Sequence, residues 1–191
     1  MKTINLTSKA AVSLLLIAVS ICFFGCTSGS SSETPSQPAA LAIGQSYGGG
    51  KIFYLDGTGL HGLIAAPSDQ THSTWGDATI ATNATGTALG TGQSNTTTIV
   101  GALGVGSYAA AICDQLVIGG YSDWYLPSRD ELSYLYNQKA LIGGLGSPYF
   151  EYWTSTEKTA NSVYVIRFND GSLQTQSKVS GTSSTRAIRS F

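Results

Sequence analysis

The chain has 191 residues and a formal net charge of −1, and only 11% of its residues are charged. A nucleic-acid-binding domain normally carries a strongly basic surface, so this charge balance excludes nucleic acid as a partner. Hydrophobic residues make up 42% of the sequence, which excludes a wholly disordered chain and predicts a domain with its own core.

Residues 1–25 have the pattern of a lipoprotein signal peptide. Basic residues precede an uncharged apolar run over 10–24, which is shorter than the roughly 20 residues that span a bilayer. The run ends in Phe23-Phe24-Gly25-Cys26, which resembles the bacterial lipobox with two phenylalanines in place of the usual Leu and small residue. We therefore expect lipidation at Cys26 and a lipid-anchored protein of the bacterial cell envelope, on the outer membrane or the cell surface. Ordinary secretion with Cys26 unmodified is the alternative.

Residues 26–43 are rich in Ser, Thr and Pro and are expected to form a flexible linker between the lipid and a folded domain. Cys22 would leave with the signal peptide and Cys26 would carry lipid. Cys113 is then the only remaining cysteine, so no disulfide is expected within the domain.

The folded domain, residues 44–191, is expected to begin with strands over 51–55 and 60–66, joined by a Gly-containing turn. The polar stretch 67–92 follows and contains Trp75. A loop of this length is uncommon in a compact domain and is often functional.

Helices are predicted next, from their capping signals. We expect Asn95 to cap a helix that ends near Leu103, and Ser107 to cap a second one. Ser128 and Glu131 form the capping box of a third helix. The glycine pairs expected to end the second and third helices are Gly119-Gly120 and Gly143-Gly144.

Four strands are predicted in the remainder, over 152–156, 163–168, 173–178 and 186–191. The turn Asn169-Asp170-Gly171 joins the second of them to the third. Strands followed by helices and then by strands predict an α+β fold.

Five segments, in order, resemble motifs of the Lcl C-terminal domain family, named for the end domain of a bacterial collagen-like adhesin. They are 48–54, 61–68, 123–128, 152–157 and 186–191. The resemblance covers about residues 44–191. It implies a C-type-lectin-like fold, with a mixed or antiparallel sheet, two flanking helices and paired terminal strands. It also implies a role in adhesion, with sulfated glycans as ligands of the namesake. The namesake's collagen-like repeat, which trimerises it, is missing from this sequence, so the resemblance leaves the oligomeric state open.

No set of residues predicts an enzyme or a cofactor. Gly104–Ala109 fits G-x-G-x-x-A, but no βαβ pattern surrounds it. Ser68, His72 and Asp77 could be arranged as a hydrolase triad, yet no nucleophile motif supports them. Formylglycine-generating enzymes share the C-type-lectin-like architecture but use a pair of thiols, and Cys113 has no partner.

No metal site is predicted either. The two histidines stand outside any zinc-binding spacing. The Glu-Pro-Asn and Gln-Pro-Asp tripeptides of calcium-dependent lectins are absent.

Charge is distributed unevenly along the chain. Residues 27–157 hold three cations against ten acids, whereas residues 158–191 hold five cations against one acid. Such asymmetry can create a positive patch that attracts an acidic polymer, although ordinary solvated strand positions are the alternative. The candidate ligand-binding cations are Lys158, Arg167 and Lys178.

Aromatic rings near Gly-rich loops are the second candidate feature, because an exposed ring can stack on a sugar. Trp75, Tyr149 and Tyr152 are the candidates, with packing in the core as the alternative for each. The resulting hypothesis is a surface-anchored, non-catalytic binding or adhesion domain for a glycan or another extracellular polymer. A structural or protein-interaction module is the alternative function.

Overall fold

The structure is a computed structural model that describes residues 40–145, 151–180 and 183–191. The chain divides into two units, residues 1–38 and 39–191. The predicted signal peptide, Cys26 and most of the predicted linker lie outside the described residues. Among the helices of the described part, none is long and apolar enough to cross a membrane.

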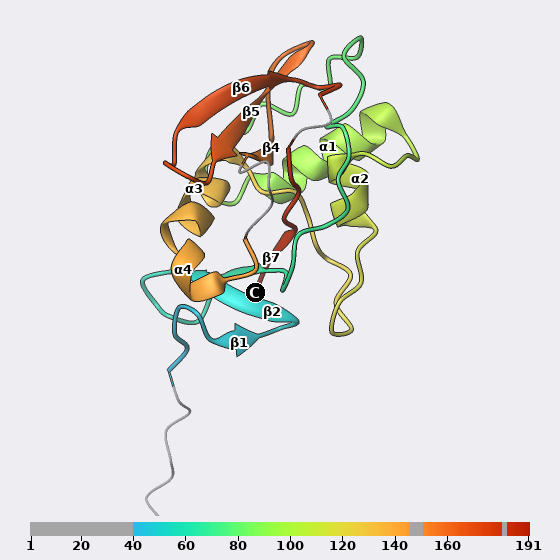
Figure 1. Cartoon of the computed structure of the whole chain (residues 1–191). Coiled ribbons are helices and arrows are strands. Elements are labelled where there is room, and N and C mark those ends of the chain that lie inside the picture. The colour runs from blue at the N-terminus through green and yellow to red at the C-terminus, as the bar shows by residue number, and fades with distance from the viewer. Residues whose placement is uncertain (1–39, 146–150, 181–182) are drawn as a thin grey trace, which may run out of the picture. The chain divides into compact units, whose positions relative to one another are not determined.

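The described part contains four helices and seven strands (Figure 1). The helices are α1 (Gly92–Leu103), α2 (Ala109–Asp114), α3 (Arg129–Asn137) and α4 (Lys139–Ile142). The strands are β1 (Ser46–Tyr47), β2 (Gly50–Leu55), β3 (Gly62–Ala65), β4 (Glu151–Thr159), β5 (Ser162–Arg167), β6 (Leu173–Ser177) and β7 (Ile188–Ser190).

The strands form two antiparallel sheets, with the orders β1-β2-β3-β7 and β4-β5-β6. The predicted α+β class is therefore confirmed. The expected single sheet is replaced by two, and the C-terminal strand β7 pairs with β3 instead of the first strand. A parallel bridge between Tyr152 and Ser184 links β4 to the C-terminal segment.

The C-terminal segment 183–191 connects the two sheets (Figure 1). At one end, the Trp153 amide of β4 donates to the Ser184 carbonyl at 2.9 Å. Farther along, Ile188 and Tyr125 exchange two backbone hydrogen bonds of 2.8 and 3.0 Å. Residues 183–189 are buried, so this segment is an interior element of the fold.

The capping box of α3 is present as predicted. The Ser128 hydroxyl accepts from the Glu131 amide at 3.3 Å, and the Glu131 carboxylate accepts from the Ser128 amide at 2.7 Å. Helix α1 ends at Leu103 as predicted, but its predicted start is wrong, because the helix begins at Gly92. Asn95 lies inside it, buried, and its side-chain amide makes two hydrogen bonds to the backbone of Gly86. Asn95 therefore fixes the preceding loop to the helix.

The second predicted helix is too long. Helix α2 begins at Ala109 without a side-chain cap and ends at Asp114, well before Gly119. Gly104 ends α1 with a φ of 70°, which glycine adopts without strain. The Gly104–Ala109 segment therefore joins two helices. The dinucleotide-binding motif that it matches follows a strand, so the segment lacks the structural context of that motif.

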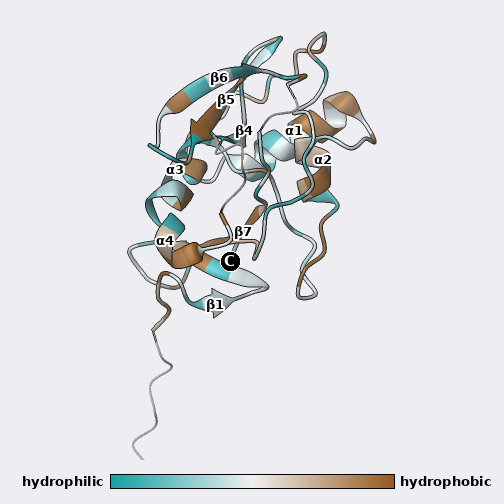
Figure 2. Cartoon of the chain, in the orientation of Figure 1, coloured by the Kyte–Doolittle hydropathy of each residue, from teal (hydrophilic) through white to brown (hydrophobic). Residues whose placement is uncertain are grey.

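Alternating residues of the first sheet pack into two separate apolar clusters. Ile52 and Ile64 join one cluster with the three tryptophans, while Phe53 and Leu63 join another beneath α3. In the second sheet, β5 is mainly hydrophobic and β6 mainly hydrophilic (Figure 2). Strand β6 is thus the outer, solvent-facing edge of that sheet.

Candidate functional site

Trp75 was a candidate for stacking on a sugar, and the structure places it in the core. Its side chain has 0% relative exposure, and the indole N–H donates to the carbonyl of Thr154 at 2.7 Å. The long loop between β3 and α1 is present as expected, but this hydrogen bond ties it to β4. The expectation of an exposed ring at Trp75 is therefore wrong, because the ring packs inside the fold.

Tyr152 is also buried. Its hydroxyl donates to the Asp69 carboxylate at 2.8 Å, and its ring packs against Phe168 with centroids 4.3 Å apart. This ring therefore holds the 66–70 segment against β4 and is closed to an external ligand. Tyr149 lies outside the described residues.

Lys178 was predicted as a surface cation, and this prediction is wrong. The side chain is fully buried, and its ammonium lies 2.5 Å from the carboxylate of Glu157, which is also buried. The same ammonium donates to the Ile80 carbonyl at 2.6 Å, while Glu157 accepts from the Thr82 hydroxyl at 2.7 Å. The pair therefore fastens the 80–83 part of the long loop to the second sheet.

The other cations of the C-terminal region, apart from Lys158, also pair with acids from the first part of the chain. Arg186, fully buried, contacts the Asp69 carboxylate at 2.7 Å. Arg189 makes two hydrogen bonds to Asp123, of 2.7 and 2.8 Å, and lowers the pKa of that carboxyl. The charge asymmetry of the sequence therefore reflects pairing across the fold and does not produce a broad positive patch.

Arg167 is partly exposed and pairs with Glu151 on the neighbouring strand at 3.0 Å. Glu151 lies opposite Arg167 at the start of β4, whereas Lys158 lies near the other end of that strand. The three predicted cations Lys158, Arg167 and Lys178 are thus divided between two ends of a sheet and its interior, and they do not form one surface.

Lys158 is the predicted cation that remains available. Its side chain is exposed and forms no ion pair with any described residue. The ammonium donates to the Thr175 hydroxyl at 3.2 Å and lies 5.7 Å from the centroid of the Tyr164 ring. The three side chains come from β4, β5 and β6, and Tyr164 and Thr175 are register partners.

Arg129, at the start of α3, adds a second cation near the same ring. It pairs with Asp130 at 2.8 Å, and this pairing, with a smaller electrostatic contribution from Tyr164, raises the pKa of the guanidinium. Together, Lys158, Tyr164, Thr175 and Arg129 are called the Tyr164 surface below. The alternation along β5 placed Tyr164 away from Val163 and Val165, but the sequence did not reveal which face would remain open.

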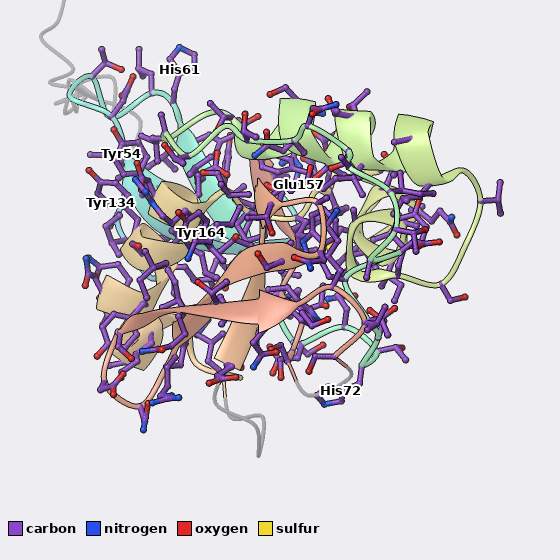
Figure 3. All side chains as sticks on the ribbon, turned by 90° about the horizontal axis from the view of Figure 1, so that it is seen from above. Tyr54, His61, His72, Tyr134, Glu157 and Tyr164 are labelled. Atoms are coloured by element: carbon purple, nitrogen blue, oxygen red, sulfur yellow. The ribbon has the colours of Figure 1, made fainter. Side chains whose placement is uncertain are left out.

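The histidines and the cysteine that were considered for catalysis lie apart in the described part of the chain. His61 and His72 lie at opposite ends of the view in Figure 3. Cys113 is fully buried, and burial raises the pKa of its thiol well above the ordinary range. Within the part of the chain that the structure describes, no group of three His, Cys, Asp or Glu side chains could hold a metal ion.

Glu131 is a buried carboxyl with a structural role. Burial raises its pKa, partly offset by hydrogen bonds from backbone amides, including that of Gly90 at 2.9 Å. The close fit requires glycine at position 92, since a Cβ there would lie 2.1 Å from the Glu131 carboxylate. This carboxyl therefore joins the long loop to α3 and does not face a cleft.

The model of the family described as the Lcl C-terminal domain matches residues 67–189. The matched region begins just after β3 and includes all the helices, the second sheet and most of β7. A search of curated proteins finds no match.

Proposed function

Because the chain belongs to the Lcl C-terminal domain family, we propose that it is a non-catalytic binding domain of the bacterial cell surface. Its ligand is an extracellular glycan or another acidic polymer, and its fold is C-type-lectin-like. The two antiparallel sheets, the flanking helices and the interior C-terminal segment support that fold assignment.

The Tyr164 surface carries the proposal. An exposed ammonium beside an aromatic ring offers a sugar a stacking surface and offers a sulfate or carboxylate a positive charge. Lys158 meets this requirement because its ammonium donates to a neutral hydroxyl and no described acid forms an ion pair with it. Arg129 is paired with Asp130, so Lys158 supplies the unpaired positive charge of the Tyr164 surface.

A glycan array with the full-length chain, followed by a heparin titration at several salt concentrations, tests this function. We expect binding to acidic glycans that weakens with salt and is unchanged by EDTA. Lys158→Ala and Tyr164→Ala should each weaken heparin binding several-fold. Lys139→Ala is the matched control, because Lys139 also lies over a tyrosine ring, 4.1 Å from the Tyr136 centroid.

Two outcomes would contradict the proposal. One is the absence of binding to any glycan at low salt. The other is equal weakening by Lys139→Ala and Lys158→Ala, which would indicate a response to total charge and not to the Tyr164 surface.

The lipid anchor is the second part of the proposal and has its own test. The apolar run and Cys26 support lipidation and attachment to the outer membrane or cell surface. Cys26→Ala should move the protein from the membrane fraction to the soluble fraction, and unchanged retention would refute lipidation.

A protein-interaction module is a second candidate function, favoured by a different surface. Val105 has 99% relative exposure between two glycines, and it lines a groove of about 500 Å³ with the exposed Ile80 and Val179. Exposed apolar side chains around a groove are typical of protein contacts. Under this function, Val105→Asp would abolish capture of a protein partner, and glycans would have no effect.

A further inference from the structure

We propose that the groove between the β1–β2 hairpin and the end of α4 is a second binding site, specific for a carboxylate-bearing monosaccharide unit. It is separate from the Tyr164 surface and does not depend on it. Figure 1 shows α4 beside the β1–β2 hairpin.

The groove has the size of a small-molecule site. Its volume is about 610 Å³, within the range of about 300–1,000 Å³ that is typical of ligand pockets. Three pieces of chain form its walls: residues 46–51, residues 66–67 and residues 142–144.

The walls are held in place from inside by Arg186. One of its guanidinium nitrogens donates to the Ala66 carbonyl at 2.9 Å, and another donates to the Gly144 carbonyl. The guanidinium is itself fixed by Asp69, whose carboxylate accepts from Nε at 2.8 Å. Because two of the three walls share this buried anchor, the groove is formed before a ligand arrives, which lowers the entropic cost of binding.

The charge of the lining selects an anion. Among the described residues that line the groove, Lys51 has the only charged side chain. Its ammonium donates to the Leu141 carbonyl at 3.3 Å, and no ion pair to it is found among the residues of known position. A single lysine supplies one point charge, which suits one carboxylate on a small ligand.

The rest of the lining suits a sugar ring. Tyr47 is 43% exposed, and its ring rests against Phe191 with centroids 5.0 Å apart, so the aromatic surface is supported from one side. Gly48–Gly50 contribute peptide groups without side chains, and Ser46 contributes a hydroxyl. Hydroxyl groups of a sugar can hydrogen-bond to these polar groups while its apolar face contacts Tyr47.

Calorimetric titration of the full-length chain with D-glucuronate tests the proposal, with D-glucose as the neutral probe of the same ring size. Glucuronate should bind at least tenfold more tightly than glucose. Lys51→Met should remove that preference, and Tyr47→Ala should weaken binding of both sugars. Lys139→Ala removes a lysine that does not line the groove, so it is the matched control and should leave glucuronate binding unchanged.

A further variant fills the groove, so that loss of binding can be tested in a protein that is still folded. Ser46→Trp adds bulk at an exposed position of β1 and should abolish glucuronate binding while the melting temperature stays near that of the parent protein. The proposal is overturned if glucuronate fails to bind at millimolar concentration, or if Lys51→Met binds as the parent does. Loss of binding in Lys158→Ala alone would assign the sugar to the Tyr164 surface and would also overturn it.

Discussion

Glu157 and Lys158 are neighbours on β4, yet they belong to different regions of the molecule. Glu157 points into the fold and binds the buried Lys178, whereas Lys158 points outward to Tyr164 and Thr175. The interior region uses charge to fasten a long loop. The outer region leaves a charge available to solvent and therefore to a ligand. The comparison shows that Lys158 and Lys178, for which the sequence predicted the same role, lie in opposite environments, one exposed and the other buried and paired.

The largest expected effect comes from removing the interior cation. Lys178→Met would leave Glu157 buried without its partner, which typically costs about 3–5 kcal/mol of unfolding free energy. Lys158→Met is the matched change on the outer face and should alter stability by less than about 0.5 kcal/mol. Urea denaturation of both variants measures the difference, and similar losses for the two would contradict the division into regions.

The next largest effect on stability is expected from a comparison of Trp75, in the interior, with Tyr164, on the outer face. Trp75→Phe removes the indole donor and leaves the Thr154 carbonyl buried without that partner, at a cost of about 1–3 kcal/mol. Tyr164→Phe keeps a ring on the outer sheet face and should stay within about 0.5 kcal/mol of the parent. Thermal unfolding of both variants is the measurement. A larger loss for Tyr164→Phe would show that Tyr164 has a structural role.

A smaller effect, on the pH dependence of stability, is expected from Glu131. Burial raises the pKa of Glu131 in the folded state above its ordinary value near 4.5, so the folded protein favours the protonated carboxyl. As pH rises from below 4.5 through that raised pKa, the parent protein should lose stability relative to Glu131→Gln, which keeps a capping side chain. Denaturation curves at intervals between pH 4 and 8 measure this difference.

Asp170 is the exposed control for that experiment, because hydrogen bonds from Ser172 lower the pKa of its carboxyl. Its stabilising contribution is present above the unfolded pKa and is lost as pH falls. The difference between the parent and Asp170→Asn should therefore run in the opposite direction. Differences of the same sign for both carboxyls would contradict the assignment of Glu131 as buried.

The smallest expected effect is at Cys113. Its thiol is buried and its pKa is raised by burial, so a thiol reagent should not react with it in the native protein and should react after denaturation. Rapid reaction in the native state would revive the formylglycine-generating alternative. The measurement uses a thiol reagent that releases a chromophore when it reacts, and the absorbance of this chromophore reports the reaction.

Local patterns predicted what depends on neighbouring residues. Hydrophobic runs next to turn residues gave the positions of β2 and β5 to within a residue or two, and the Ser128–Glu131 spacing gave the start of α3. These signals succeed because the interactions that create them span only a few residues.

The candidate site was harder to predict because its determinants lie far apart in the sequence. Trp75 is buried, and its indole donates a hydrogen bond to Thr154, which is 79 residues away in the sequence. No residue close to Trp75 in the sequence indicates that contact. The number of cations in the last 34 residues suggested a positive patch. The acids that neutralise Arg186 and Arg189 come from the first part of the chain, so counting charges within the C-terminal segment alone missed the pairing. Among the predicted residues that the structure describes, Lys158 is exposed, and Arg167 is partly exposed but paired with Glu151.

The interior position of residues 183–191 has a consequence for how the domain is made. This segment contributes the partner strand of β3 and the backbone partners of Tyr125 and Trp153, so without it the first sheet lacks a strand and β4 loses one of its backbone links to the rest of the fold. A nascent chain released before residue 183 would lack the piece that holds its halves together. The ribosome must therefore synthesise residues 183–191 before the native domain can close, and long-range closure of this kind is characteristically slow.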